Sequence, residues 1–212
     1  MNSIVYTESL PERTKGVVTI LQQQQPTFLQ SFYLSGGTGL SLQIGHRESE
    51  DLDFFCQNPF NPLQLEKELA ALGKLESTEL AVGTLNTFFN QVKLQFLEYP
   101  YPLIQPSTEW RGIKLSSVLD IACTKLQTLS MRGSKKDFVD IFFLLNAFSL
   151  QEILLQAETK YSTVNYNQAH ILKSLVYFDD AEHQPMPRMI KQISWIDIKQ
   201  RMVDEVKKIS FV

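Results

Sequence analysis

A glycine pair and two spaced aspartates lie close together in the N-terminal half of the chain. Gly36-Gly37-Thr38 comes first, and Asp51 and Asp53 follow shortly after it. Glycines let a backbone approach a bound group closely, and a helix beginning there offers free N–H groups and a positive dipole end to phosphate. Aspartates two residues apart on a strand project to one face, where they can share a divalent cation. The pattern predicts a site for a magnesium-bound phosphate group.

Each part of this pattern also has an ordinary structural explanation. A Gly-Gly pair often marks only a tight turn, and paired aspartates at a strand edge are often simply solvated. The order of the parts is more informative than either part alone. An apolar run, the glycines, a short helix and a second strand follow one another closely, and Arg47 and Ser49 precede the aspartates on the same segment. Taken together, the pattern favours a functional site.

The elements that must position these residues follow from the apolar pattern. Residues 12–31 predict a helix that Pro26 interrupts, and Phe32 to Leu34 predict a short strand that ends at the glycines. The other elements predicted for this half are a short helix ending at Gly45, a strand at 51–55, a helix at 63–73, and strands at about 80–89 and 91–98.

The pattern changes after a group of prolines. From Pro106 onward, long segments carry apolar residues at helical spacing, as between Leu115 and Leu129. We therefore predict an α/β (α+β) protein in which a small mixed-sheet domain is followed by an α-helical bundle. The predicted domains are residues 1–105 and residues 106–212, and the second domain is expected to complete the cleft of the first.

Composition excludes several classes of protein. Apolar residues make up 43% of the chain and charged residues 20%, which is ordinary globular usage. The net charge of −3 and the pI of about 5.7 leave no overall basic field, so a nucleic-acid partner would need a local patch. No signal peptide or membrane-spanning run is visible, which predicts a cytoplasmic protein without membrane contact. Cys56 and Cys123 are expected to be buried free thiols.

Two longer stretches resemble a known protein family. Residues 33–40, YLSGGTGL, and residues 45–55, GHRESEDLDFF, resemble the signature of the AbiEii/AbiGii-type toxins. These toxins are a branch of the DNA polymerase β-like nucleotidyltransferase superfamily. Lys125 and residues 132–140, RGSKKDFVD, are similar to the family's later Lys and Lys-Asp-x-x-Asp motifs. Residues 177–182, YFDDAE, also resemble the family, but no mechanism follows from them.

The resemblance implies a toxin-like nucleotidyltransferase that moves a nucleoside monophosphate from an NTP to an acceptor. In related toxins the acceptor can be tRNA, and a protein acceptor stays open. The implied partners are therefore an NTP, an RNA acceptor and a cognate antitoxin, and the implied cofactor is Mg²⁺. The implied roles are metal binding and catalysis for Asp51 and Asp53, and nucleotide binding for Gly36, Gly37, Thr38, Arg47 and Ser49.

Three residues of the second half are further catalytic candidates. Lys125 lies on the polar edge of a predicted helix, from which it could contact phosphate as a point charge, although a solvated lysine is the alternative. Asp137 and Asp140 lie three residues apart and could orient Lys125 or Arg132 by ion pairing. Alternatively, Asp137 lies at the N-terminus of a helix only because a negative charge there is favoured by the helix dipole.

The sequence departs from the superfamily pattern at Gln95, where a third carboxylate is expected on a neighbouring strand. A neutral amide ligates a cation weakly and cannot act as a base, and Glu98 faces the other side of an ideal strand. Either one metal ion suffices, or activity is reduced or lost. The alternative function is a catalytically weak nucleotide-binding protein that acts through a partner. The acidic pI disfavours a nucleic-acid-binding module without chemistry.

Overall fold

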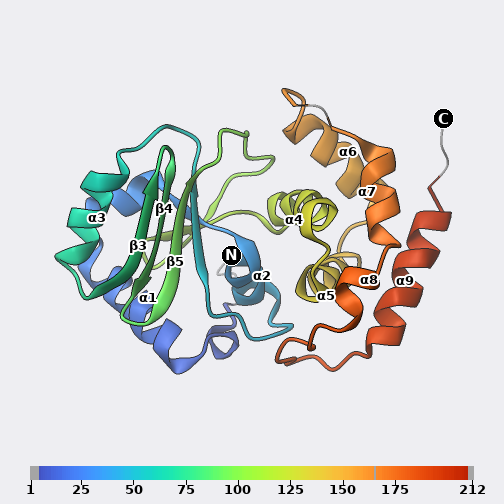
Figure 1. The fold of residues 1–212 in the computed structure, drawn as a ribbon, viewed down its shortest axis with the longest axis horizontal. Coiled ribbons are helices and arrows are strands. Elements are labelled where there is room, and N and C mark those ends of the chain that lie inside the picture. The colour runs from blue at the N-terminus through green and yellow to red at the C-terminus, as the bar shows by residue number, and fades with distance from the viewer. Residues whose placement is uncertain (1–4, 165, 210–212) are drawn as a thin grey trace. The chain divides into compact units, whose positions relative to one another are not determined.

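The computed structural model describes residues 5–164 and 166–209. The chain divides between Ser117 and Val118 into two compact units, which we call the sheet unit and the helical unit (Figure 1). The sheet unit mixes helices and strands, and the described part of the helical unit contains helices and loops, which confirms the predicted fold class. The division falls after a β-hairpin that the sequence analysis did not predict. What each unit contributes to activity stays a prediction.

The strands of the sheet unit form a mixed sheet. Within the described residues it has seven strands in the order β3-β4-β5-β2-β1-β7-β6. Near its centre, β2 (Leu52–Cys56) runs parallel to β5 (Val92–Glu98) and antiparallel to β1 (Tyr33–Leu34). Residues that pair across neighbouring strands share a face of the sheet. The other strands are β3 (Leu75–Ala81), β4 (Thr84–Phe89), β6 (Thr108–Trp110) and β7 (Ile113–Leu115).

The predicted break at Pro26 is confirmed. Helix α1 (Glu12–Gln24) ends at Gln25 in the left-handed conformation, and the short 3-10 helix η2 (Thr27–Ser31) follows Pro26. Proline cannot donate the main-chain hydrogen bond that a continuing helix needs. The other helices of the sheet unit are η1 (Thr7–Ser9), α2 (Gly36–Ile44) and α3 (Pro62–Ala70).

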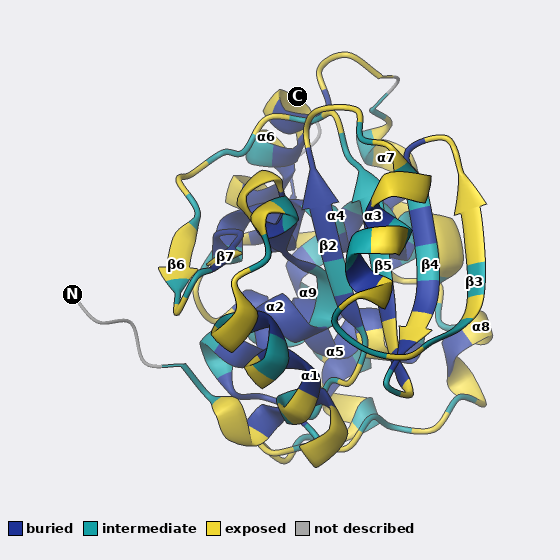
Figure 2. Cartoon of the chain, turned by 90° about the vertical axis from the view of Figure 1, so that its left-hand side faces the viewer, coloured by how far each residue is buried: buried dark blue, intermediate teal, exposed yellow. Residues whose placement is uncertain are grey.

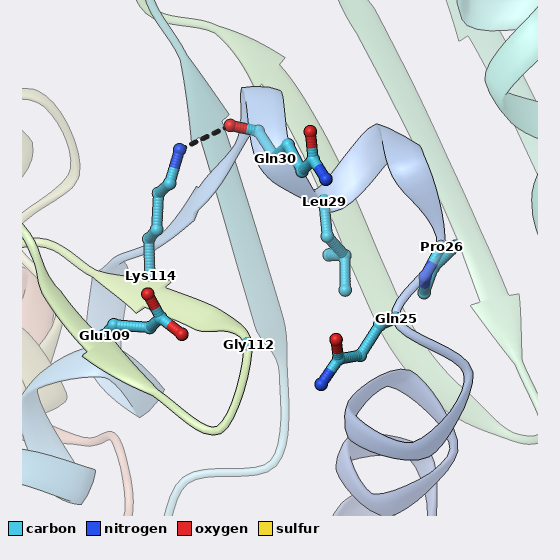
Figure 3. Close-up of a pocket in the computed structure, with 7 residues that line it drawn as sticks. All are labelled: Gln25, Pro26, Leu29, Gln30, Glu109, Gly112 and Lys114. Atoms are coloured by element: carbon cyan, nitrogen blue, oxygen red, sulfur yellow. Dashed lines mark hydrogen bonds between the residues drawn. The ribbon is translucent and has the colours of Figure 1, made fainter.

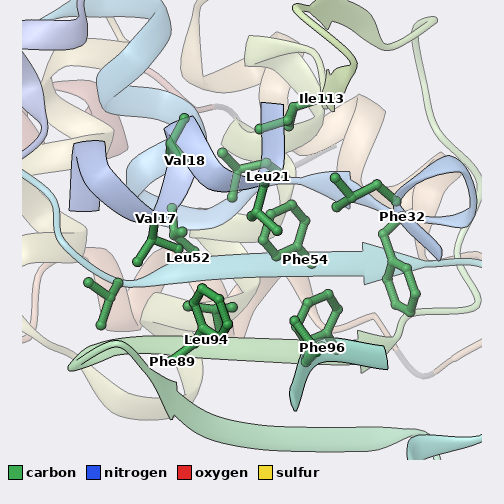
Figure 4. Close-up of a cluster of buried hydrophobic side chains, with 14 of the residues drawn as sticks. Val17, Val18, Leu21, Phe32, Leu52, Phe54, Phe89, Leu94, Phe96 and Ile113 are labelled. Atoms are coloured by element: carbon green, nitrogen blue, oxygen red, sulfur yellow. The ribbon is translucent and has the colours of Figure 1, made fainter. Parts of the chain in front are cut away.

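The apolar core lies on one face of the central strands (Figure 4). Side chains alternate along a strand, so the residues between the core positions, such as Asp53 and Gln95, point to the opposite face. This alternation separates the apolar core from the polar face on which the predicted site lies. The core includes Val17, Val18 and Leu21 of α1, Leu52 and Phe54 of β2, and Leu94 and Phe96 of β5.

The sheet ends in an exposed edge strand that was only partly foreseen. A single strand was expected at about 80–89, but the structure has β3 and β4 joined by a turn at Gly83, whose φ is +65°. The apolar pattern that would identify β3 in the sequence is weak, because most residues of this strand are exposed (Figure 2). A β-bulge between Glu76 and Glu79 interrupts its pairing, as is common where an edge must not recruit another strand.

The helical unit is organised around α4 (Val118–Arg132), which packs against three later helices. The predicted apolar stripe is buried from Leu119 to Leu129. Its first predicted residue, Leu115, lies instead in β7, and Val118 is half-buried. None of the helices in the described ranges combines the length and the apolar character needed to cross a bilayer. The following helices are α5 (Lys135–Leu144), α6 (Leu150–Lys160), α7 (Gln168–Leu175), α8 (Asp179–Glu182) and α9 (Trp195–Lys207).

The two cysteines are buried free thiols, as predicted. Burial, together with the nearby carboxylate of Glu98, raises the pKa of the Cys56 thiol to about 11. Burial likewise raises the pKa of the Cys123 thiol to about 12. Because the thiolate is the reactive form, neither residue has the character of a catalytic nucleophile.

A buried ion pair joins the first turn of α4 to the last turn of α6. Lys160 Nζ lies 2.8 Å from Asp120 Oδ1, and the two side chains are 1% and 2% exposed. Charges this deeply buried are tolerated only when they are paired. The pair therefore constrains how the two helices meet.

We predict that Lys160→Met destabilises the helical unit by roughly 3–5 kcal/mol, because it removes the ammonium group from a buried carboxylate. The double variant Asp120→Leu with Lys160→Met should recover most of this loss. Urea unfolding followed by Trp195 fluorescence in a Trp110→Phe background measures the effect. Lys208→Met is the control and should cost less than about 1 kcal/mol, because the Lys208 side chain is 65% exposed and Arg201 still pairs with Glu205. A loss no larger than this control would contradict the prediction.

Candidate functional site

Gly36 and Gly37 lie directly against the other predicted site residues. Gly36 has a φ of +62°, and a Cβ atom placed there would overlap with the Asp53 carboxylate. A Cβ atom on Gly37 would lie 2.5 Å from Arg47 Nη2 and 3.1 Å from Ser49 Oγ. Any side chain would therefore displace these groups. The first turn of α2 thus meets a carboxylate, a guanidinium and a hydroxyl at one place.

Hydroxyl groups hold the loop that carries Asp51. The fully buried Thr38 donates a hydrogen bond to the main-chain oxygen of Asp51, and its Oγ1 lies 2.9 Å from Ser49 Oγ. Thr14 of α1 donates to the main-chain oxygen of Glu50 at 3.0 Å. The Thr38 hydroxyl is therefore used within the protein. The sequence analysis missed Thr14, because an isolated threonine in a helix carries no signal of a contact so distant in the chain.

A polar row crosses the sheet at Asp53. Asp53 pairs in register with Gln95 of β5, which pairs in turn with Asn86 of β4. The Oδ1 atom of Asn86 is buried and accepts no hydrogen bond from the described residues. Glu98 pairs with Cys56, a core residue, so it lies on the face opposite to Asp53. The position beside Asp53 is therefore occupied by an amide and not by a third carboxylate.

The donor chemistry of this face fits one magnesium ion. Among the residues that the structure describes, no three His, Cys, Asp or Glu residues are grouped so that they could hold a metal ion. Magnesium, however, is commonly held by one or two carboxylates together with substrate phosphates. Asp53 supplies a carboxylate with the amide of Gln95 beside it, and Asp51, which directly precedes β2, would supply a second carboxylate. The described residues therefore form no site that could hold a metal ion with three or more such side chains of their own. The carboxylates and the amide do fit a magnesium site that substrate phosphates would complete.

A pocket of about 210 Å³ adjoins Asp51. Phe88 and Lys93 face one another across β4 and β5 at this pocket, and Phe88 is 41% exposed. A basic and aromatic wall next to Asp51 offers contacts to a substrate that carries negative charge and a flat ring. The pocket is lined by Arg13, Thr14, Glu50, Asp51, Phe88, Gln91, Val92 and Lys93.

A second pocket of the sheet unit, of about 200 Å³, lies between the end of α1, η2 and the β6–β7 hairpin (Figure 3). Lys114 donates a hydrogen bond to the main-chain oxygen of Gln30 across it. It contains none of the predicted site residues. Its lining residues are Gln25, Pro26, Leu29, Gln30, Glu109, Gly112 and Lys114.

The helical unit brings its predicted residues together in a buried charge cluster. Lys125 Nζ lies 2.9 Å from Asp137 Oδ1 and 2.5 Å from Asp140 Oδ2. Both aspartate side chains are fully buried, and the Lys125 side chain is 6% exposed. Arg132 and Ser134 donate to the second oxygen of Asp137, each at 2.8 Å. The expected ion pairing is confirmed, and the alternative of a solvated Lys125 is wrong.

The cations of this cluster determine the charge state of Asp137. Burial alone would raise its pKa, but attraction by Lys125 and the hydrogen bonds from Arg132 outweigh burial and lower the pKa from 3.8 to about 2. The carboxylate is therefore ionised at neutral pH.

Comparison with known proteins decides the family. The sequence profile of the family described as "Nucleotidyl transferase AbiEii toxin, Type IV TA system" matches residues 19–101 and 88–211. The chain belongs to the AbiEii family. A protein of Aquifex aeolicus (strain VF5), aq_aa25, is 36% identical to this AbiEii chain over 159 residues, which are 72% of this chain and 76% of that protein. The predicted family and enzyme class, a nucleotidyltransferase, are thereby confirmed.

Solved structures share the fold of this AbiEii protein at low sequence identity. An H. pylori protein classed provisionally as a nucleotidyltransferase has a TM-score of 0.56 at 16% identity, over 93% of this chain and 94% of its own. MenT4, a nucleotidyltransferase toxin from Mycobacterium tuberculosis H37Rv, has a TM-score of 0.51 at 13% identity, over 94% of this chain and 87% of its own. At such low sequence identity, these similarities show a shared fold and nothing further.

We predict that Asp137 makes the AbiEii chain lose stability in acid. Its folded pKa of about 2 lies below the unfolded value of about 3.9, so its contribution is present above pH 4 and is lost as the pH falls toward 2. The expected loss is about 2 kcal/mol. Urea unfolding between pH 2 and pH 6 should show this loss in the wild type and not in Asp137→Asn. Equal pH dependence of the two proteins would contradict the assignment.

Proposed function

We propose that this AbiEii nucleotidyltransferase transfers a nucleoside monophosphate from an NTP to an acceptor, with Mg²⁺ held by Asp51 and Asp53. The observation that carries the proposal is the close contact between Gly36 and the Asp53 carboxylate. It puts the N-terminus of α2 beside the acidic face of β2. Phosphates and the cation that accompanies them need these two features at one place.

The glycines and their neighbours would bind the nucleotide phosphates. Because they carry no side chains, Gly36 and Gly37 would let a phosphate come close to the first N–H groups of α2. Arg47 would add a charge-assisted hydrogen bond, and Ser49 a hydroxyl donor, because both lie against Gly37. Thr38 would position the loop that carries Asp51, since its hydroxyl is bonded there.

The acidic residues would orient the substrate through the cation. When bound, Mg²⁺ would neutralise the charge that develops on the phosphates during transfer. The main chain that carries the two carboxylates would be held in place, since Thr38 bonds to the main-chain oxygen of Asp51 and Asp53 lies in the paired strand β2. Gln95 would add a neutral oxygen beside Asp53 and leave the site with two negative charges.

Lys125, Asp137 and Asp140 are the proposed catalytic residues of the helical unit. Lys125 would meet a substrate phosphate as a point charge. Its two carboxylate partners at 2.9 Å and 2.5 Å would hold the ammonium group in one place. The short distances support the orienting role of Asp137 and Asp140, because a buried ammonium group is costly unless it has such partners.

The acceptor and the partner are further parts of the proposal. An RNA, such as the tRNA modified by related toxins, or a protein could accept the nucleotide. The family description as a type IV toxin–antitoxin system supports a cognate antitoxin and, with it, action in the cytoplasm. The second candidate function, a weakly catalytic nucleotide-binding protein that acts through a partner, is favoured by Gln95 beside Asp53.

We predict that NTP binding requires magnesium and that Asp53→Asn abolishes transfer with the fold intact. The variant is nearly isosteric but removes charge from the metal ligand, and we expect a rate loss on the order of a thousandfold. Calorimetry in Mg²⁺ and in EDTA measures binding, and label transfer from each NTP to total RNA and to protein measures activity. Glu79→Gln, an exposed acid on the same row of the sheet, is the matched control and should retain activity. Full transfer by Asp53→Asn would overturn the metal assignment.

We predict that Gln95→Asp separates the two candidate functions. If one magnesium ion suffices, the wild type transfers label, and the variant does so at an equal or higher rate because it adds an oxygen ligand on the acidic face. Transfer that appears only in the variant would instead identify the natural chain as a weakly catalytic nucleotide-binding protein. The same label-transfer assay measures both proteins.

A further inference from the structure

The first turn of α5, which carries Asp137, is capped by a side chain from far along the chain. Ser134 occupies the N-cap position, where serine usually accepts a hydrogen bond from the helix. Its hydroxyl instead donates to the carboxylate of Asp137, at 2.8 Å. Gln184 takes over the capping role, because its Oε1 accepts the main-chain N–H of Lys135 at 3.0 Å. Gln184 is itself held by a 2.7 Å hydrogen bond from its Nε2 to the main-chain oxygen of Asp180.

The side chain of Lys135 is held by the same region. It is buried, and its Nζ donates to the main-chain oxygen of Glu182 at 3.0 Å. The ammonium group also lies 4.8 Å from the centre of the Trp195 ring, in the geometry of a cation–π interaction. The carboxylate of Glu182 accepts hydrogen bonds from the indole N–H of Trp195 at 3.1 Å and from Lys199 at 3.0 Å. Lys135 is therefore connected to α8 and α9 at once.

Aromatic packing completes this arrangement. Phe138, the residue after Asp137, is fully buried, and its ring centre lies 5.3 Å from that of Phe178 and 5.6 Å from that of Trp195. The rings of Phe178 and Trp195 meet edge to face, with centres 5.9 Å apart. We call Phe178, Glu182, Gln184 and Trp195 the α5 clamp. The clamp includes part of the 177–182 segment for which the sequence offered no mechanism.

We propose that the α5 clamp is a positioning device for Asp137 and Asp140, with Gln184 as its positioning residue. The two carboxylates lie one helical turn apart on α5, while Lys125 lies on α4, so a rotation or shift of the first turn of α5 changes both distances to the ammonium group. Gln184 fixes that turn at its first N–H group, and the aromatic rings fix it at Phe138. The catalytic consequence rests on the proposed function, whereas the effect on Lys125 does not.

The first test measures the accessibility of Lys125 and needs no activity. In the wild type, the buried and doubly paired amine should react slowly with an acylating reagent, as followed by mass spectrometry. Gln184→Ala should raise the rate at Lys125 by roughly fivefold, the change in local opening expected for the loss of one capping bond. Asn167→Ala is the matched control, since Asn167 caps α7 through a 3.0 Å bond to the N–H of His170. It should leave the rate at Lys125 unchanged.

The second test measures transfer in the same proteins. Gln184→Ala should lower kcat by roughly tenfold to a hundredfold through misplacement of the cluster, and Asn167→Ala should not. Gln184→Glu should restore part of the rate, because its carboxylate can accept the same N–H at a helix N-terminus but loses the donor to the main-chain oxygen of Asp180. Equal effects of Gln184→Ala and Asn167→Ala on Lys125 labelling would overturn the clamp. An inactive wild type with the predicted labelling would overturn the proposed function and leave the clamp supported.

Discussion

The missing side chain at Gly36 is the constraint on which the candidate site depends. A residue with a Cβ atom would be strained at a φ of +62° and would also collide with Asp53. Because glycine satisfies both conditions, α2 can begin directly beside the acidic face of β2. The same holds one residue later, where a side chain on Gly37 would collide with the guanidinium of Arg47. The backbone at the start of α2 therefore reaches the other site residues directly, without a separate loop.

Both units keep their polar groups in place by burying them with partners. In the sheet unit, the buried hydroxyl of Thr38 bonds to the loop that carries Asp51. In the helical unit, Lys125 is enclosed by Asp137 and Asp140. A buried polar group without a partner is costly, so such contacts admit few alternative arrangements. Order at the candidate site is therefore a consequence of folding and does not require a ligand to impose it.

The amide of Gln95 changes the electrostatics of the acidic face. Its register beside Asp53 gives it the place of a third carboxylate, but it brings no charge. Two carboxylates balance one divalent cation, whereas two cations would have to draw more of their balance from substrate phosphates. The adjacent Asn86 extends this neutral polar row across the sheet. The site is consequently less acidic than the superfamily pattern leads one to expect.

The sequence by itself determined the fold class, the family and the order of the site elements, because glycine turns, strand alternation and helical apolar stripes are local signals. It did not predict the β6–β7 hairpin or the edge strand β3, whose short, exposed segments have weak apolar patterns. Only the tertiary structure decided that Lys125 is enclosed and that Gln184 caps α5. Burial of the Lys125 ion pairs depends on how whole helices pack. The contact of Gln184 joins residues far apart in the chain, and a local pattern carries no information about which distant side chain will meet a given backbone group.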